Sequence, residues 1–315
     1  MQHEKRASVF SRIYKTGKYW QRSLLLLVLP TLQGDREILA LTPKNPELAP
    51  AAAALPHSHA HNDYRHGRPL AEALSRGFVS VEADVHLVGG ELYLGHWFPQ
   101  ISAERTLRKV YLEPLQALLS RQGGQVYAGY EGIFYLMIDV KSDSLETYRV
   151  LRRQLLEYPA FQCNPYFRVF ISGNRAAFAI ADDPEQVAGI DGRLDDLEKR
   201  VGCGTMPVVS DNFRRHFDWR GKGPMPGPEL QKLKAIADAV HLQGKKLRFW
   251  SIPDEPEGWK CLLEAGVDFI STDDLEGLER FLKGRRRHTE PAGPVPSFVQ
   301  SPERERKPAA GKPVR

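Results

Sequence analysis

The sequence predicts a single (β/α)₈ barrel of the TIM type, and three observations favour that fold class. Short β-type runs alternate with helical stretches from residue 56 onward, which is the pattern of parallel α/β architecture. About eight such units fit into residues 56–283, close to the roughly 250 residues typical of these barrels. Polar side chains gather where the β-type runs end, and in a barrel those ends form the face that holds the active site.

The expected elements succeed one another regularly along this region. The first predicted strand ends at His61, and the others cover residues 78–88, 91–96, 133–142, 167–173, 186–192, 206–212, 246–253 and 267–274. A Gly-Gly hairpin joins the second strand to the third. The predicted helices cover residues 69–77, 106–122, 145–158, 229–244 and 257–266. An open doubly wound sheet is the alternative, but no G-x-G-x-x-G or P-loop follows the first strand.

One catalytic domain, residues 56–283, is expected between two tails. Residues 1–55 combine a basic stretch, the apolar run SLLLLVL at 23–29 and a Pro- and Ala-rich linker. The apolar run is shorter than the ~20 residues needed to span a bilayer, so it is either a secretory signal or a hydrophobic helix of a soluble protein. We favour export or membrane association over a cytoplasmic location. Residues 284–315 are rich in Pro, Arg, Lys and Gly, which predicts a disordered tail.

Charge and cysteine content narrow the function classes. The net charge is +5, but much of the basic excess lies in the tails rather than interleaved with aromatic residues along one face. We therefore expect no nucleic-acid partner. The three cysteines lie far apart without C-x-x-C spacing, which predicts neither a disulfide framework nor a zinc knuckle. We expect a monomer, and leave peripheral membrane contact open.

Two strands carry acidic residues inside apolar runs. Glu82 and Asp84 stand two residues apart in VEADV, so in a strand they share a face and point into the barrel mouth if the valines and alanine pack outward. Asp139 and Lys141 repeat this spacing after the apolar run IFYLMI. Buried carboxylates need protonation, cationic partners or a metal ion, and oxygen ligands suit Mg²⁺ or Ca²⁺. A structural ion pair at a strand end is the alternative for either pair alone, but two such pairs favour a site.

The histidines admit two interpretations. His57, His59 and His61 alternate in HSHAH, and alternate side chains of a strand share a face, so together they could form an imidazole metal site. In the other interpretation His61 acts with His96, which ends the strand after the hairpin. Two imidazoles beside a bound substrate suit general acid and general base catalysis near neutral pH. The second interpretation also makes use of the acidic strand.

Residues 61–96, HNDYRHGRPLAEALSRGFVSVEADVHLVGGELYLGH, resemble the opening of the superfamily of phosphatidylinositol-specific phospholipase C and glycerophosphodiester phosphodiesterase. Within it, the H-N-D-Y opening and the late strand LRFW are most similar to the altered inheritance of mitochondria protein 6 family. The resemblance implies that His61 and His96 are the catalytic histidines and that Glu82 and Asp84 bind the metal. It covers roughly residues 56–283.

The remaining roles also follow from the resemblance. Asp139 matches the third acidic ligand, and Lys141 matches the lysine two residues beyond it. Asn62 departs from the H-R-G of glycerophosphodiesterases and matches the His-Asn of eukaryotic phosphoinositide phospholipases, whose asparagine is a metal ligand. The D-x-K at 139–141 is similar to the venom sphingomyelinase D branch, so no single branch supplies the substrate.

The expected function is metal-dependent hydrolysis of a glycerophosphodiester or phospholipid-type substrate, with one Mg²⁺ or Ca²⁺ ion and two catalytic histidines. Two alternatives stay open. One is a zinc hydrolase of the amidohydrolase type built on the H-x-H run, which leaves the E-x-D strand unexplained. The other is a non-catalytic barrel that binds anionic lipid headgroups.

Overall fold

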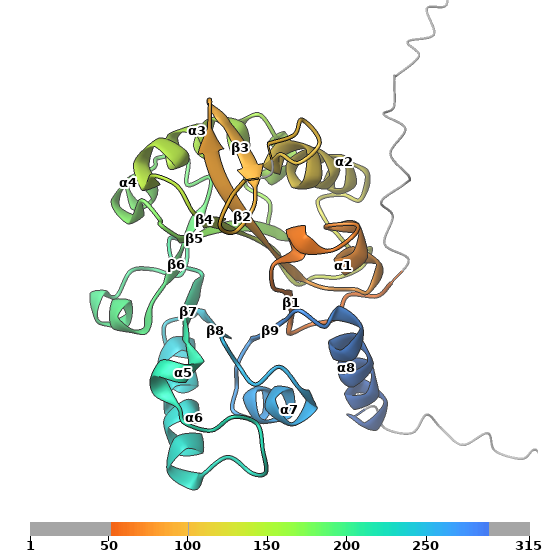
Figure 1. Cartoon of the computed structure of the whole chain (residues 1–315), viewed down its shortest axis with the longest axis vertical. Coiled ribbons are helices and arrows are strands. Elements are labelled where there is room, and N and C mark those ends of the chain that lie inside the picture. Colours follow the sequence, from red (N-terminus) through yellow and green to blue (C-terminus); the bar gives the residue numbers. More distant parts are fainter. Residues whose placement is uncertain (1–51, 100, 290–315) are drawn as a thin grey trace, which may run out of the picture. The chain divides into compact units, whose positions relative to one another are not determined.

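The computed structural model describes residues 52–99 and 101–289, and within them the predicted barrel is confirmed (Figure 1). The strands join in the order β1-β9-β8-β7-β6-β5-β4-β2, and pairing between β1 and β2 closes the ring. All eight of these neighbouring pairs are parallel. The barrel strands are β1 Ser58–Ala60, β2 Ser80–Val88, β4 Phe134–Val140, β5 Phe167–Gly173, β6 Gly189–Gly192, β7 Val208–Asn212, β8 Lys246–Trp250 and β9 Phe269–Thr272.

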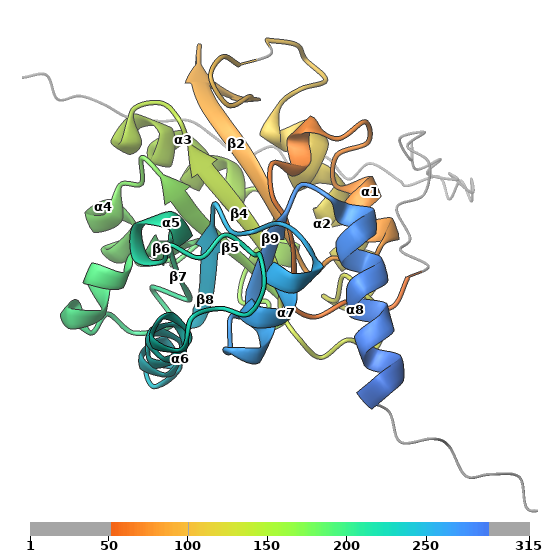
Figure 2. The ribbon, with the colours of Figure 1, turned by 60° about the horizontal axis from the view of Figure 1, so that its bottom comes forward.

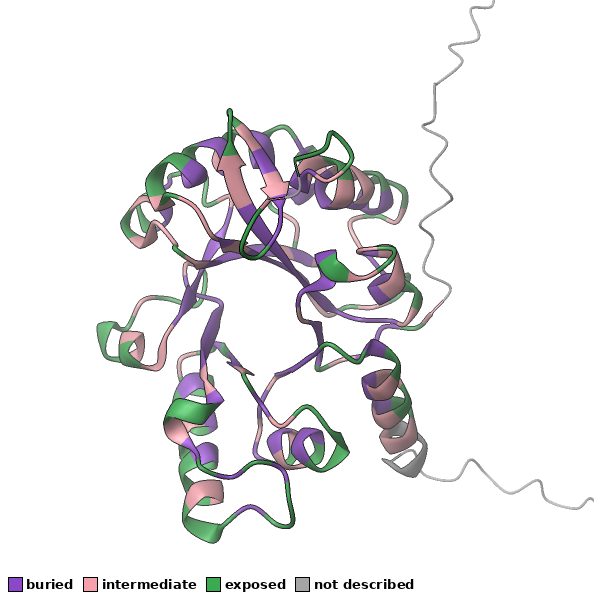
Figure 3. Cartoon of the chain, in the orientation of Figure 1, coloured by how far each residue is buried: buried purple, intermediate pink, exposed green. Residues whose placement is uncertain are grey.

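Helices lie outside the ring of strands, and their outward faces are exposed (Figures 2 and 3). Asp143 caps the helix Ser144–Leu156, since its side chain accepts a hydrogen bond from the Glu146 backbone nitrogen. The α-helices are α1 Ala71–Ser75, α2 Glu113–Arg121, α3 Ser144–Leu156, α4 Ala177–Ala181, α5 Phe213–His216, α6 Gly227–His241, α7 Pro256–Glu264 and α8 Leu275–Thr289. Four shorter or irregular helical segments are η1 Asp63–Arg65, η2 Arg108–Leu112, η3 Pro159–Phe161 and η4 Leu194–Lys199.

The predicted Gly-Gly hairpin extends β2 beyond the barrel mouth. β2 pairs antiparallel with β3, Glu91–Leu94, and both Gly89 and Gly90 have the positive φ that a tight hairpin turn requires. Just after β3, the Gly95 backbone nitrogen donates to the Asp84 carbonyl oxygen over 3.1 Å. The hairpin therefore brings the segment after β3 back beside the acidic end of β2.

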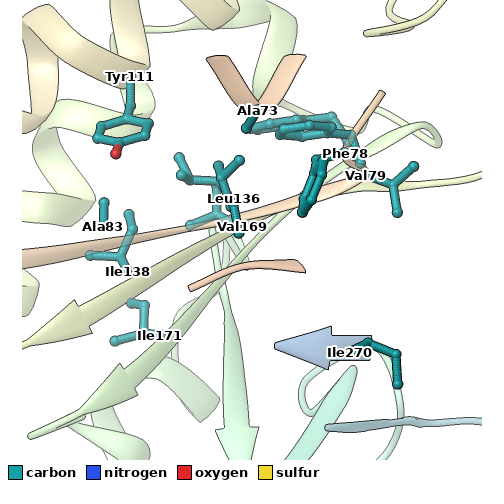
Figure 4. Close-up of a cluster of buried hydrophobic side chains, with 14 of the residues drawn as sticks. Ala73, Phe78, Val79, Ala83, Tyr111, Leu136, Ile138, Val169, Ile171 and Ile270 are labelled. Atoms are coloured by element: carbon teal, nitrogen blue, oxygen red, sulfur yellow. The ribbon is translucent and has the colours of Figure 1, made fainter. Parts of the chain in front are cut away.

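Alternation along the strands separates the outer core from the barrel interior. Ala83, Leu136, Ile138, Val169 and Ile171 belong to the core between sheet and helices, where Figure 4 shows them with Tyr111 beyond the sheet. The intervening positions face the interior. There a second cluster of buried side chains fills the barrel, made of Tyr135, Met137, Phe170, Val208 and Phe269. Glu82 and Asp84 occupy the same inward positions on β2.

The predicted domain limits need two corrections. α8 continues to Thr289, so the tail does not begin at residue 284. The basic residues near its end do not terminate this helix, because Lys283 pairs with Glu279 (2.6 Å) and Arg285 pairs with Glu264 (3.5 Å). At the other end, Leu55 is buried and pairs with Phe78, so the barrel includes the last residues assigned to the linker.

The rest of the predicted tails, residues 1–51 with the apolar run 23–29 and residues 290–315, lies outside the described residues. No helix in the described part of the chain is both long enough and apolar enough to cross a membrane.

Candidate active site

Three carboxylates converge at the mouth of the barrel. Glu82, Asp84 and Asp139 each offer an oxygen atom, and these atoms lie within 4.8 Å of one another. Glu82 and Asp84 share the inner face of β2, and Asp84 is the register partner of Asp139 on the neighbouring strand β4. Burial, reinforced by the charge of Glu82, raises the pKa of Asp139 to about 6. The arrangement therefore concentrates negative charge that needs a cationic partner.

Lys141 supplies part of that positive charge. Its Nζ lies 3.0 Å from Oδ1 of Asp139 and 3.3 Å from Oδ2 of Asp84. Burial opposes the charged form, but the two carboxylates outweigh it and raise the pKa of Lys141, so the lysine stays protonated. Asp84 still keeps one buried oxygen, Oδ1, without a hydrogen bond.

A buried charge pair holds Glu82 from inside the barrel. Oε2 of Glu82 accepts hydrogen bonds from Arg248 (2.9 Å) and from Nε2 of His59 (3.2 Å). Burial disfavours the ionised form of Glu82, but the guanidinium of Arg248 and the hydrogen bond from His59 hold its pKa below the usual range. Burial, assisted by Arg248, lowers the pKa of His59 to about 4, so His59 is neutral and Nδ1 accepts from Ser80 (2.7 Å).

His61 lies directly after β1 at the mouth, with 31% of its side chain exposed. Its Nδ1 donates to Oδ1 of Asp273 over 3.0 Å. Burial alone would lower the pKa of His61, but the hydrogen bond to Asp273 and the charge of Glu82 together outweigh it and raise the pKa. The contact fixes the ring through Nδ1, and Nε2 lies 3.4 Å from Nδ2 of Asn62.

His96 is held in the same way, by a carboxylate of the acidic cluster. Its Nδ1 donates to Oδ2 of Asp84 over 2.6 Å, and 41% of its side chain is exposed. His86, the next inward position of β2 after Asp84, donates from Nε2 to the His96 carbonyl oxygen over 3.0 Å. Each of the two predicted catalytic histidines thus has its Nδ1 on a carboxylate and an accessible ring.

Asn62 and Tyr64 connect Asp273 to Asp84 through hydrogen-bonding contacts. The Tyr64 hydroxyl lies 3.1 Å from Oδ1 of Asn62 and 2.9 Å from Oδ2 of Asp84, within reach of both acceptors. Asn62 adopts a left-handed conformation with φ 51°, which its short amide side chain tolerates better than most. Its Nδ2 donates to Asp273 over 3.3 Å.

The alternating histidines do not form a metal site. His57 donates from Nδ1 to the Asp268 carbonyl oxygen at the start of the barrel strands, and His59 is fully buried beneath Glu82. Only His61 reaches the mouth. Within the described ranges, the cluster of metal-ligating types that the structure assembles consists of carboxylates alone, Glu82 with Asp84 and Asp139. The triple-imidazole interpretation is therefore wrong.

Several contributors were not assigned roles from the sequence. Arg248 stands between Leu247 and Phe249 in an otherwise apolar strand, and a lone arginine there was a signal for a buried countercharge. Asp273, which directly follows β9, is the partner of His61. Trp250 lies at the end of β8, with the Arg193 guanidinium 5.0 Å from its ring centroid.

The comparisons with known proteins agree with the predicted resemblance. Residues 51–168 match the family model described as AIM6-like phosphodiesterase domain. The chain is 28% identical over 271 residues to altered inheritance of mitochondria protein 6 of Eremothecium gossypii, covering 71% of this chain and 68% of that protein. It is 26% identical over 266 residues to the homolog of Arthroderma benhamiae, covering 71% and 82%.

A solved structure of a glycerophosphodiester phosphodiesterase from Parabacteroides distasonis aligns with a TM-score of 0.48 at 15% identity, covering 75% of this chain and all of that one. The predicted likeness to the phosphodiesterase superfamily near the altered inheritance of mitochondria protein 6 family is confirmed.

Proposed function

We propose that this chain, whose residues 51–168 match the AIM6-like phosphodiesterase domain, hydrolyses a glycerophosphodiester or phospholipid-type substrate with a divalent cation and two histidines. One observation carries the proposal. The oxygens of Glu82, Asp84 and Asp139 lie within 4.8 Å of one another, beside two histidines that are each held through Nδ1 by a carboxylate. Such a pairing of an acidic cluster with two oriented imidazoles suits acid–base chemistry on a phosphate ester.

The residues present fit a hard divalent cation. All three carboxylates offer oxygen atoms, and Oδ1 of Asp84 is buried without a hydrogen bond, a costly arrangement that a cation would relieve. Glu82, Asp84 and Asp139 would hold Mg²⁺ or Ca²⁺, with Asn62 as a further oxygen ligand. When bound, the ion would neutralise phosphate charge and lower the pKa of a nucleophilic hydroxyl or water.

The two histidines would move the protons. Nδ1 of His61 is hydrogen-bonded to Asp273, and Nδ1 of His96 is hydrogen-bonded to Asp84. Nε2 of each ring would therefore be the nitrogen that exchanges a proton with the substrate. One Nε2 would accept the proton of the attacking hydroxyl or water, and the other would donate a proton to the leaving alcohol oxygen. Asp273 is a positioning residue in this scheme.

Lys141 would stabilise negative charge on the phosphoryl group. Its ammonium group is held by Asp139 and Asp84 and stays protonated, so it is a fixed positive charge beside the cluster. The alternative, a non-catalytic barrel that binds lipid headgroups, predicts ligand binding without turnover. A hydrolysis assay distinguishes the two.

The test is hydrolysis of bis(p-nitrophenyl) phosphate and a panel of glycerophosphodiesters and lysophospholipids, with and without EDTA. We expect EDTA to abolish turnover and Mg²⁺ or Ca²⁺ to restore it better than Zn²⁺. His61→Ala should remove activity. His241→Ala is the matched control, since His241 pairs with Asp268 away from the mouth. Metal binding by a folded protein that turns over no substrate in the panel would contradict the proposal.

A further inference from the structure

Large apolar side chains project beside the candidate active site. Trp97 is 80% exposed, Phe98 85% and Ile101 66%, and they follow His96 in the loop between β3 and η2. Figure 3 shows this loop as mostly exposed. Single exposed apolar residues are ordinary on protein surfaces, whereas a group of them marks an interaction surface. We call Trp97, Phe98 and Ile101 the apolar rim.

The loop that carries the apolar rim is anchored at both ends. The Leu94 backbone nitrogen donates to the Arg105 carbonyl oxygen (2.9 Å), and the Arg105 guanidinium donates to the Tyr64 carbonyl oxygen (2.7 Å). The turn that opens the loop requires glycine, because a Cβ at Gly95 would lie 2.3 Å from the Phe98 carbonyl oxygen. The apolar rim is therefore exposed on a loop that hydrogen bonds hold in place.

The apolar rim is continuous with the site. The Trp97 ring meets the His96 ring edge to face, with centroids 4.6 Å apart. A surface that engages the apolar rim therefore lies within reach of the same mouth that would receive a phosphodiester.

Charge next to the apolar rim favours an anionic surface. Arg65, at the end of η1, and Arg68, just after it, are exposed, and the Arg105 hydrogen bond to Tyr64 joins η1 to the loop of the apolar rim. Glu104 is an exposed acid within that loop, so the basic excess is modest. Projecting aromatic side chains beside arginines suit the headgroup region of a bilayer, where aromatic rings are stable and basic side chains meet anionic lipids.

We propose that the apolar rim inserts into the surface of a lipid bilayer that contains anionic lipid, and so places the barrel mouth over a lipid substrate held there. This inference rests on the proposed function, because it selects the membrane-borne members of the proposed substrate class. It assigns Phe98 and Ile101 a role in binding the surface and none in the chemical step.

Vesicle co-sedimentation of the full chain tests the proposal. The probes are phosphatidylcholine vesicles with and without phosphatidylglycerol. We expect Phe98→Ser/Ile101→Ser to weaken binding about tenfold or more, because each side chain loses its transfer into an apolar phase. Leu242→Ser is the matched control, since Leu242 is 89% exposed after α6 at the opposite end of the barrel. Both variants should hydrolyse soluble bis(p-nitrophenyl) phosphate as the wild type does.

Fluorescence gives an independent readout. Trp97→Phe keeps an aromatic side chain in the apolar rim but removes its indole. Wild type should show a blue shift on adding vesicles, and the variant should bind while losing most of that shift.

Two results would overturn the inference. One is wild-type protein that does not bind vesicles while hydrolysing the soluble substrate, which would leave the proposed function intact. The other is a wild type that self-associates through this surface, with the double variant monomeric and vesicle binding unchanged. Vesicle binding that depends on the apolar rim in a chain without any turnover would instead support the surface and contradict the proposed function.

Discussion

Nδ1 of His96 lies 2.6 Å from Oδ2 of Asp84, so one carboxylate both belongs to the acidic cluster and orients a histidine. Asp84 is fully buried, and burial together with the charge of Glu82 raises its pKa. Its Oδ2 also lies within reach of Tyr64 and Lys141, while Oδ1 has no hydrogen bond. The two oxygens therefore differ in their surroundings: Oδ2 contacts side chains, and Oδ1 is the atom that we propose as a cation ligand.

Asp84→Asn should impair both tasks at once. We expect loss of divalent-cation affinity and a fall in kcat of about 10²-fold or more, because a ligand charge and the acceptor for His96 both change. Calorimetric titration with Mg²⁺ or Ca²⁺ and steady-state kinetics measure the two effects. Asp143→Asn is the control, since Asp143 caps α3 and does not contact the cluster. Unchanged cation affinity with lowered kcat would restrict Asp84 to orienting His96.

Asp273→Asn should lower kcat without unfolding the protein. The Asp273 side chain is 64% exposed, so its replacement disturbs little packing, but the acceptor for Nδ1 of His61 is weakened. We expect about a 10²-fold loss in kcat with little change in KM, because orientation of the imidazole matters in the chemical step. Removing the carboxylate also lowers the pKa of His61, so the kinetic limb due to His61 should move to lower pH. A pH–rate profile that does not move would contradict the pairing.

Arg248→Met should destabilise the fold. Arg248 and Glu82 are both buried, and loss of the guanidinium leaves the Glu82 carboxylate without its countercharge. Breaking such a pair costs about 3–5 kcal/mol. The double variant Glu82→Gln/Arg248→Met should recover part of that loss, because the uncompensated charge is gone. Urea unfolding of the wild type, the two single variants and the double variant gives the coupling energy, and additive losses would contradict a coupled pair.

The local parts of the site could be predicted from the sequence. Alternation placed Glu82 and Asp84 on one face of a strand, and the two glycines indicated the hairpin that returns His96 to the mouth. These features depend on residues close together in the chain. The fold class was predictable for the same reason, since alternating strands and helices leave few topologies.

The long-range parts could not be predicted in this way. The register that sets Asp84 beside Asp139 arises from strand pairing, and the pair of Glu82 and Arg248 joins residues 166 positions apart across the barrel. The sequence marked Arg248 as an unusual residue in an apolar strand, but its partner depends on closure of the ring. The metal site predicted from the alternating histidines was wrong because His57 precedes β1 and is hydrogen-bonded to the Asp268 carbonyl oxygen. Its side chain therefore does not point into the barrel mouth with that of His61.

The buried carboxyl of Asp63 should make stability depend on pH in a direction opposite to ordinary acid denaturation. Burial raises its pKa to about 6 from 3.8, although its Oδ2 accepts from the Leu70 backbone nitrogen (2.6 Å) and the Tyr111 hydroxyl (2.7 Å). Since the folded state binds this proton more tightly than the unfolded state, Asp63 favours folding when protonated. Its contribution is lost as pH rises from about 4 to above 6, by about 3 kcal/mol in all.

Asp63→Asn isolates that contribution. An asparagine can keep its oxygen on Leu70 and Tyr111, and it does not titrate. The free energy of unfolding of wild type relative to Asp63→Asn should therefore fall between pH 4.5 and pH 7.5, measured by urea unfolding of both proteins at each pH. Other carboxylates titrate equally in both proteins and cancel in the difference. A difference that stays constant with pH would mean that Asp63 is ionised in the folded protein across this range, and that its two hydrogen bonds outweigh the cost of burial.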